Sequence, residues 1–255
     1  MVYFVGAGPG ACDLITVRGM RLLEKADVII YAGSLVNPEL IKYAPQTAKV
    51  YNSAAMTLED VISVIMAAED EGKTTVRLHT GDMSLYGAVR EQMDILDEKG
   101  IAYESCPGVS ACFGAAASLD LEYTLPGVTQ TLIITRMEGV TNVPEKESIE
   151  ELAKHKASMA VYLSTGMLDR LSDRLMAGGY DANTPAAIVY KATFPEEKKI
   201  VCTVKTLPDV AAQNGITKTA VVLVGDVITH NGYDRSKLYD PSFETGFRRR
   251  ENKDA

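Results

Sequence analysis

Apolar positions in the first part of the chain form short continuous runs, separated by longer segments with helical spacing. The runs are rich in β-favouring residues and predict strands at 1–5, 27–31, 74–78 and 102–105. Such runs are typical of parallel sheets that are covered on both faces. Helical spacing predicts helices at 17–25, 58–71, 88–98 and 112–117, with Thr16 capping the first and a Thr57–Asp60 capping box starting the second. This order predicts a mostly parallel α/β domain with helices on both faces and right-handed crossovers.

The pattern changes after about residue 121. Further apolar runs predict strands at 131–135, 158–163, 186–190, 199–203 and 220–224, with helices at 148–154 and 168–177. Hairpin-length gaps between the late strands indicate a mixed sheet. We therefore expect an N-terminal α/β domain at 1–120 and a C-terminal α/β domain at 121–240. The charged residues 241–255 have no periodicity, and we expect them to form a disordered tail.

Composition excludes several classes of protein. The chain has 255 residues, a formal net charge of −8 and four cysteines without a CxxC pair. The charge disfavours a general nucleic-acid surface, and the cysteine spacing disfavours a zinc site or a disulfide scaffold. With only three histidines, well separated, we expect no metal site in the protein. No signal peptide is evident, and no apolar run approaches the roughly 18 residues of a membrane span, so we expect a cytoplasmic protein without membrane contact.

Glycine-rich segments follow three of the predicted strands, at 6–10, 81–87 and 107–111. Open α/β sheets bind ligands at the carboxyl ends of their strands, so we expect these segments to line one cleft. The first segment fits the GxGxxG/A dinucleotide pattern. However, residues 12–15 separate it from the Thr16 cap, and the second strand ends in Tyr31-Ala32 rather than in an acid. Both departures disfavour a nicotinamide or flavin site, and a turn needed only for close backbone packing is the alternative.

Polar and aromatic side chains near these segments are candidates for ligand binding. Asp82 can accept hydrogen bonds from a ligand, or it can form an Asx turn or a helix cap of its own. Tyr86 can stack on a flat ligand or pack at a hinge. Arginine suits carboxylates because it bonds them bidentately, while surface ion pairs are the alternative for each arginine. The arginines nearest the segments are Arg18, Arg21, Arg77, Arg90 and Arg136.

Six short segments together resemble the tetrapyrrole (corrin/porphyrin) methyltransferase family, over residues 2 to about 226. They are VGAGPGACDLIT, ADVIIYAGSLV, TGDMSLYG, CPGVSA, TRMEG at 135–139 and VYLSTGM at 161–167. The resemblance implies a two-domain fold with the active site in the cleft between the domains, a homodimer, and S-adenosylmethionine as methyl donor, with S-adenosylhomocysteine as product. The donor contacts that it implies are Pro9, Thr80, Gly81, Asp82, Leu85, Ser110, Ala111, Leu163, Ala192 and Ala220.

The implied substrate is a tetrapyrrole, whose carboxylates need cationic partners. The resemblance therefore makes Arg18, Arg77, Arg90 and Arg136 substrate contacts, with Tyr86 against the macrocycle. No acid–base catalyst is assigned. The family usually has proline where Met83 stands, and methionine leaves φ of that loop less restricted.

The segment at 31–36, YAGSLV, distinguishes branches of the family. The uroporphyrinogen-methylating branch has an aspartate, proposed as its base, at the position of Ala32. Alanine cannot accept a proton, so the resemblance favours the branch that methylates C11 of precorrin-4, or of its cobalt form in the anaerobic route to cobalamin. The alternatives are uroporphyrinogen-III methylation, a ribosomal RNA or protein methyltransferase of the same fold, and a non-catalytic nucleotide-binding regulatory module.

Overall fold

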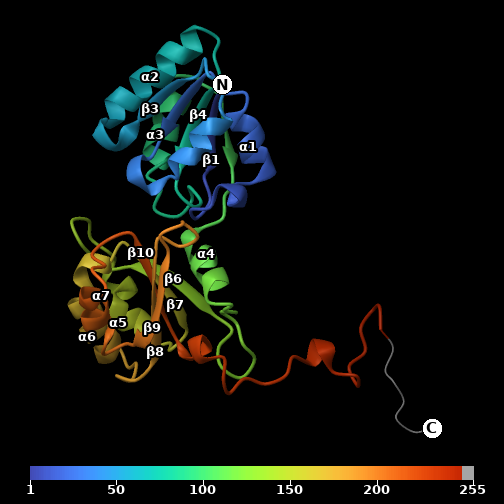
Figure 1. Ribbon diagram of the computed structural model, residues 1–255, viewed down its shortest axis with the longest axis vertical. Coiled ribbons are helices and arrows are strands. Elements are labelled where there is room, and N and C mark those ends of the chain that lie inside the picture. The colour runs from blue at the N-terminus through green and yellow to red at the C-terminus, as the bar shows by residue number, and fades with distance from the viewer. Residues whose placement is uncertain (249–255) are drawn as a thin grey trace. The chain divides into compact units, whose positions relative to one another are not determined.

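The computed structural model describes residues 1–248, and the chain folds into two compact units (Figure 1). Unit 1 consists of Met1–Ser118 and Val189–Lys198. Unit 2 consists of Leu119–Ile188 and the residues from Lys199 onward. Every predicted helix and strand is present, with ends within two residues of the predicted ones.

Unit 1 contains a five-stranded sheet in the order β3-β2-β4-β1-β5. All its pairs are parallel, as predicted. The register pairs Gly6 with His79 and Val5 with Cys106, so β1, β4 and β5 end at the same edge. The strands are β1 (Val2–Gly6), β2 (Val28–Tyr31), β3 (Lys49–Asn52), β4 (Thr75–His79) and β5 (Tyr103–Cys106).

Two helices of unit 1 begin at the predicted caps. Thr16 accepts a hydrogen bond from the Gly19 amide at 3.1 Å, and Thr57 and Asp60 form the predicted capping box. These side chains satisfy amide groups that have no partner within the helix. The helices are α1 (Val17–Leu23), α2 (Leu58–Asp70), α3 (Arg90–Glu98) and α4 (Ala111–Ser118).

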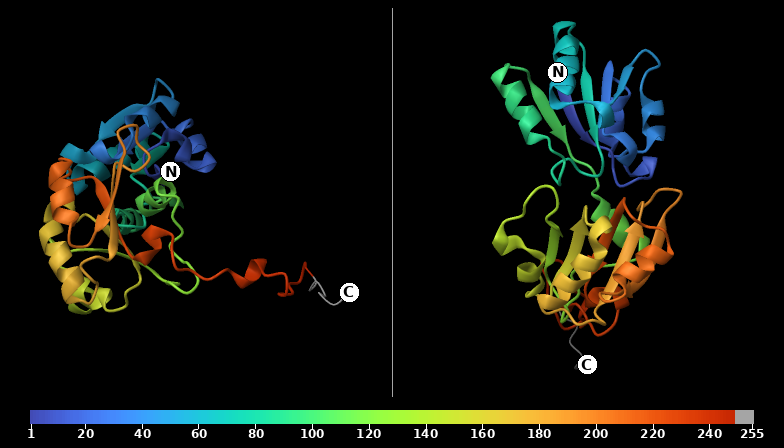
Figure 2. Two further views of the ribbon diagram at one scale, coloured as in Figure 1. Left: turned by 60° about the horizontal axis from the view of Figure 1, so that its bottom comes forward. Right: turned by 90° about the vertical axis from the view of Figure 1, so that its left-hand side faces the viewer.

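Both faces of this sheet are covered, as the apolar strands predicted (Figure 2). On one face, Phe4 and Ile30 pack with Ile65 of α2 and Leu96 of α3. On the other face, residues including Val5 and Ile29 pack with Leu23 of α1. Because neighbouring residues of a strand point to opposite faces, β1 and β2 each contribute to both clusters.

Unit 2 contains a mixed five-stranded sheet in the order β6-β7-β10-β8-β9. β6 pairs with β7 in parallel and β7 pairs with β10 antiparallel, which confirms the predicted mixed sheet. Helix α6 contacts both α5 and α7. The elements are β6 (Leu132–Arg136), α5 (Ile149–Ala153), β7 (Ser158–Tyr162), α6 (Leu168–Ala177), β8 (Pro185–Tyr190), β9 (Lys198–Thr203), α7 (Leu207–Gln213) and β10 (Ala220–Val224).

One strand and one α-helix were not predicted. Strand β3 is largely exposed at the edge of its sheet, so it lacks the apolar run by which the other strands of unit 1 are predicted. Helix α7 is short and buries only Leu207 and Ala211, which is too few positions to establish helical spacing.

The residues expected to form the tail lie partly within the described chain. The Arg248 guanidinium donates to the carbonyls of Leu238, Asp240 and Phe243 at 2.7–3.1 Å. The rest of that expected tail, 249–255, lies outside the described residues. Among residues 1–248, no helix is long and apolar enough to cross a membrane.

Candidate active site

The turn after β1 and the loop after β4 are joined through their backbones. Gly8 and Gly81 exchange two hydrogen bonds, of 3.2 and 2.9 Å, and the Ala7 amide donates to the His79 carbonyl at 2.7 Å. Gly8 and Gly81 have φ of +81° and +60°, a conformation that glycine adopts without steric cost. Two of the three glycine-rich segments therefore form one backbone surface.

The third segment, after β5, lies against the same surface. A Cβ atom on Gly108 would lie 2.2 Å from the Gly81 carbonyl oxygen, and one on Gly6 would lie 2.6 Å from the Gly108 Cα. No side chain fits at either position without displacing backbone. The glycines are thus required for the three strand-end segments to come together.

Asp82 connects two of these segments. Its carboxylate accepts hydrogen bonds from the Gly108 amide at 2.8 Å, from the Ser84 amide at 2.9 Å and from the Ser84 hydroxyl. The Ser84 amide bond is an Asx turn, one of the alternatives that the sequence left open. Burial opposes ionisation of this carboxyl, but the three hydrogen bonds outweigh it, so the pKa of Asp82 lies below its ordinary value.

The segment Val189–Lys198 completes this edge of unit 1. Its Thr193 hydroxyl accepts a hydrogen bond from the Ala11 amide at 2.9 Å. A Cβ atom on Gly10 would lie 2.6 Å from the Ala192 carbonyl oxygen, so the two turns are in direct contact. Ala192 therefore lies beside the turn after β1, although it is about 180 residues away in the sequence.

A cavity of about 620 Å³ opens beside these turns. Polar side chains of Cys12 and Asn37 line it together with the aromatic rings of Tyr43 and Phe194. Burial, helped by the negative charges of Glu39 and Asp13, raises the pKa of the Cys12 thiol. A protonated thiol is a poor nucleophile, so this cavity is suited to binding rather than to covalent catalysis by Cys12.

In unit 2, a second set of predicted contacts gathers where β7 ends. The Thr165 hydroxyl donates to the Ala220 carbonyl at 3.2 Å, and the Ser164 hydroxyl accepts from the Met137 amide at 3.0 Å. Leu163 has a left-handed φ of +53° and is 64% exposed. An exposed apolar side chain held in an unfavourable backbone conformation is a feature typical of a ligand site.

A sequence model of the Tetrapyrrole (Corrin/Porphyrin) Methylases matches residues 1–208. The chain belongs to this family. It is 50% identical over 252 residues to a cobalt-precorrin-4 C(11)-methyltransferase of Methanocaldococcus jannaschii, covering 99% of this chain and 97% of the relative. These findings confirm the family that the six sequence segments indicated.

Solved structures of tetrapyrrole methylases share the fold. That of a cobalamin biosynthetic enzyme, cobalt precorrin-4 methyltransferase, is 45% identical with a TM-score of 0.87, covering 89% of this chain and 95% of its own. A Thermus thermophilus uroporphyrin-III C-methyl transferase, complexed with S-adenosyl homocysteine, is 23% identical with a TM-score of 0.74. It covers 90% of this chain and 99% of its own, and it supports the fold alone.

The arginines of this methylase lie in very different environments. Arg77 is buried in β4, where its guanidinium donates to Gln92 and to the Ile30 carbonyl, both at 3.1 Å. Burial lowers the pKa of Arg77 to about 10. Arg18 is exposed on α1 and forms no ion pair within residues 1–248. Arg18 is thus accessible to an anion, whereas Arg77 is not.

Arg90 is exposed at the start of α3. It pairs with Asp94 at 2.7 Å and with Asp97 at 2.9 Å. Hydrogen bonds with Tyr103 and Asp94 raise its pKa above the ordinary value. Tyr86, in the loop after β4, is 42% exposed at a left-handed φ of +57°.

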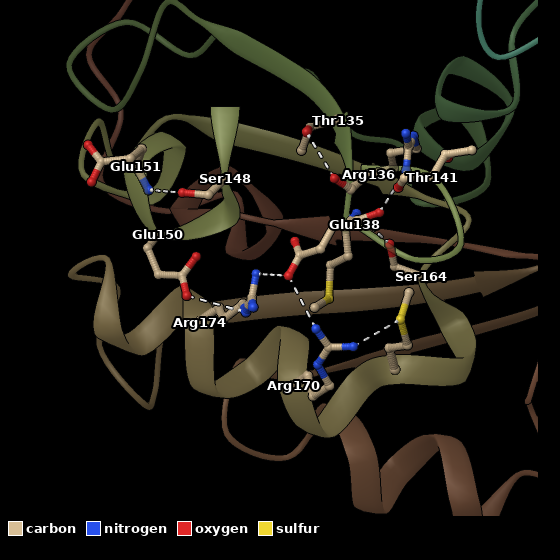
Figure 3. A network of polar contacts seen from close by, with 12 residues as sticks. Thr135, Arg136, Glu138, Thr141, Ser148, Glu150, Glu151, Ser164, Arg170 and Arg174 are labelled. Atoms are coloured by element: carbon tan, nitrogen blue, oxygen red, sulfur yellow. Dashed lines mark hydrogen bonds and ion pairs between the residues drawn. The ribbon is translucent and has the colours of Figure 1, made fainter. Parts of the chain in front are cut away.

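Arg136 organises the loop that follows β6 (Figure 3). Its guanidinium donates to the carbonyls of Met137, Thr141 and Asn142 at 3.0–3.2 Å. Glu138 of this loop pairs with Arg170 and Arg174 of α6. Of the four predicted substrate arginines, Arg77, Arg90 and Arg136 have protein partners.

Two features had no signal in the sequence. His79 is buried and its Nε2 has no hydrogen-bond partner within the described residues. Burial, together with the nearby positive charge of Arg77, lowers the pKa of His79 to about 3. Glu197 accepts hydrogen bonds from the Thr193 amide nearby in the chain and from the distant Ser118 hydroxyl, and the second contact depends on tertiary structure. No group of three metal-ligating side chains occurs in the described part of the chain.

Proposed function

We propose that this methylase transfers a methyl group from S-adenosylmethionine to C11 of precorrin-4, or of cobalt-precorrin-4, in cobalamin synthesis. The observation that carries the proposal is the 50% identity, over nearly the whole chain, to the cobalt-precorrin-4 C(11)-methyltransferase of Methanocaldococcus jannaschii. Ala32 agrees with it, because the proposed base of the uroporphyrinogen-methylating branch is missing here.

The strand-end segments fit the methyl donor. Fixed backbone at Gly81 and the neighbouring ionised Asp82 provide the polar groups that an adenosine and an amino-acid moiety require. The Thermus thermophilus neighbour of the same fold was solved with S-adenosyl homocysteine. The proposed donor contacts in unit 1 are Pro9, Thr80, Gly81, Asp82, Leu85, Ser110, Ala111 and Ala192. Leu163 and Ala220 are proposed as the contacts that unit 2 contributes.

The chain's own contribution to the reaction is binding and orientation. When bound, S-adenosylmethionine supplies an electrophilic methyl group on a sulfonium, so an electron-rich ring carbon needs little activation by a base. The buried His79 is neutral at physiological pH. Holding the reacting groups in line can by itself supply about 7–11 kcal/mol. We assign no general base.

Carboxylates of the tetrapyrrole require cationic partners. Arg18 is the first choice, since it is exposed and has no ion pair within residues 1–248. Arg90, Arg136 and Arg77 would have to exchange protein partners for the substrate, and Tyr86 is exposed enough to lie against the macrocycle. From the family resemblance alone we also propose a homodimer in the cytoplasm, which light scattering and cell fractionation would test.

Methyl-transfer assays on three tetrapyrroles test the proposed function. Purified protein is incubated with S-adenosylmethionine and precorrin-4, cobalt-precorrin-4 or uroporphyrinogen III, and the products are analysed by mass spectrometry. We expect one methyl group on a precorrin-4 substrate and none on uroporphyrinogen III. Methylated uroporphyrinogen would overturn the branch assignment. Binding of S-adenosylhomocysteine without turnover of any tetrapyrrole would instead favour a regulatory module.

A further inference from the structure

The turn that carries Ala192 is held in an unusual conformation. Lys191 and Thr193, on either side of Ala192, have φ of +46° and +66°. The left-handed region is rarely occupied by a β-branched residue such as threonine. Such a conformation persists only where surrounding contacts hold it.

The Glu197 carboxylate supplies two of those contacts within unit 1. The Glu197 Oε2 accepts a hydrogen bond from the Thr193 amide at 2.6 Å and another from the Ser118 hydroxyl at 2.5 Å. Ser118 is the last residue of α4, so Glu197 ties the turn to the end of that helix. On its other side, the Thr193 hydroxyl accepts from the Ala11 amide at 2.9 Å.

The turn fits closely against the β1 turn and α4. A Cβ atom on Gly10 would lie 2.2 Å from Phe194 Cδ2, and one on Gly114 would lie 3.2 Å from the Thr193 Cγ2 and 2.7 Å from the Pro9 Cβ. Because the turn is packed this closely, a shift of its backbone would also move the β1 turn and α4. Pro9 and Ala192, both proposed donor contacts, therefore depend on how the turn is held.

We propose that Glu197 is a positioning residue for the methyl donor. It acts through Thr193 to keep Ala192 and Pro9 in place. This inference rests on the proposed function, because it takes these two residues as donor contacts. Because Ala192 and Pro9 are proposed to contact the donor and not the tetrapyrrole, we expect loss of the Glu197 carboxylate to weaken donor binding.

Three variants test the role of Glu197. Glu197→Ala removes the acceptor, Glu197→Gln keeps an amide oxygen that can accept both hydrogen bonds, and Glu98→Ala is a control at an exposed carboxylate of α3. We expect Glu197→Ala to raise the Kd of S-adenosylhomocysteine and the KM of S-adenosylmethionine about tenfold, the loss typical of a charge-assisted hydrogen bond. The kcat and the tetrapyrrole KM should stay within about twofold, because ground-state donor binding is what is lost. Glu197→Gln should recover most of the affinity, and Glu98→Ala should match the wild type.

Separate outcomes distinguish this inference from the proposed function. An unchanged Kd in a folded Glu197→Ala variant would overturn the positioning role, as would a Glu197→Gln variant as weak as Glu197→Ala. A wild-type protein that does not bind S-adenosylhomocysteine would overturn the proposed function itself. If Glu197→Ala does not fold, Ser118→Ala removes only one of the two donors to Glu197, and we then expect donor affinity to fall about threefold. No change in Kd for Ser118→Ala would count against the inference.

Discussion

Asp82 accepts a hydrogen bond of 2.8 Å from the Gly108 amide, although the strands before these residues, β4 and β5, are separated in the sheet by β1. The bond can form because Gly6, at the end of β1, has no side chain to obstruct it: its missing Cβ would lie 2.6 Å from the Gly108 Cα. Asp82 therefore holds together the loops on both sides of β1.

Replacing Asp82 should affect both stability and donor binding. Asp82→Ala leaves the amides of Gly108 and Ser84 without their acceptor, so we expect the free energy of unfolding to fall by about 1–3 kcal/mol. We also expect weaker binding of S-adenosylhomocysteine, because the loop backbone at Gly81 loses its support. Urea denaturation and calorimetry measure the two effects. An unchanged affinity would remove Asp82 from the proposed donor site.

Gly108→Ala tests the close approach of the strand-end loops. The added Cβ would lie 2.2 Å from the Gly81 carbonyl oxygen, and backbone on both sides must move to accommodate it. We expect a loss of about 1–3 kcal/mol in the free energy of unfolding, as for overpacked sites. Gly246→Ala is the control, because no atom lies within 4 Å of its Cβ position. Equal stability of the two variants would contradict the described packing.

His79 should make the protein sensitive to acid. Its pKa is about 3 in the folded protein against an ordinary value of 6.5, so the unfolded chain takes up a proton first as the pH falls. The contribution of neutral His79 to the free energy of unfolding is therefore fully present above about pH 6.5 and is lost progressively toward pH 3. Between pH 6.5 and 5 we expect the free energy of unfolding to fall by about 2 kcal/mol.

The variant His79→Leu should lose that component of the pH dependence. Denaturant unfolding at pH 7 and pH 5 measures it, with His155→Gln, at an exposed position, as the control. If the free energy of unfolding of His79→Leu falls between pH 7 and pH 5 as much as that of the wild type, other groups cause the acid sensitivity.

Arg18 and Arg90 should differ in their effect on the substrate. Arg18 is exposed without an ion pair within residues 1–248, whereas Arg90 is engaged by Asp94 and Asp97. We expect Arg18→Ala to raise the tetrapyrrole KM about tenfold, as for loss of one charge-assisted contact. Arg90→Ala should raise it less than about twofold. Steady-state kinetics at saturating donor test this, and the opposite ranking would assign the substrate contact to Arg90.

The sequence predicted most of the secondary structure because helix caps and apolar runs involve residues that are close together in the chain. Thr57 and Asp60 cap α2 through contacts three residues apart, and the apolar run at 28–31 needs only its own composition to indicate a buried strand. Strand β3 was missed for the same reason, since its exposed residues acquire strand geometry only by pairing with β2.

The sequence by itself determined the family, the two kinds of sheet and the position of each glycine-rich segment along the chain. Only the tertiary structure decided which of those segments touch, because sheet order places β1 between β4 and β5. It also decided that Val189–Lys198 belongs with unit 1 and that Arg77 and Arg136 bond to their own backbone surroundings. A hydrogen bond between residues distant in sequence produces no periodic pattern, so the protein partners of Asp82 and of the arginines could not be predicted from the sequence.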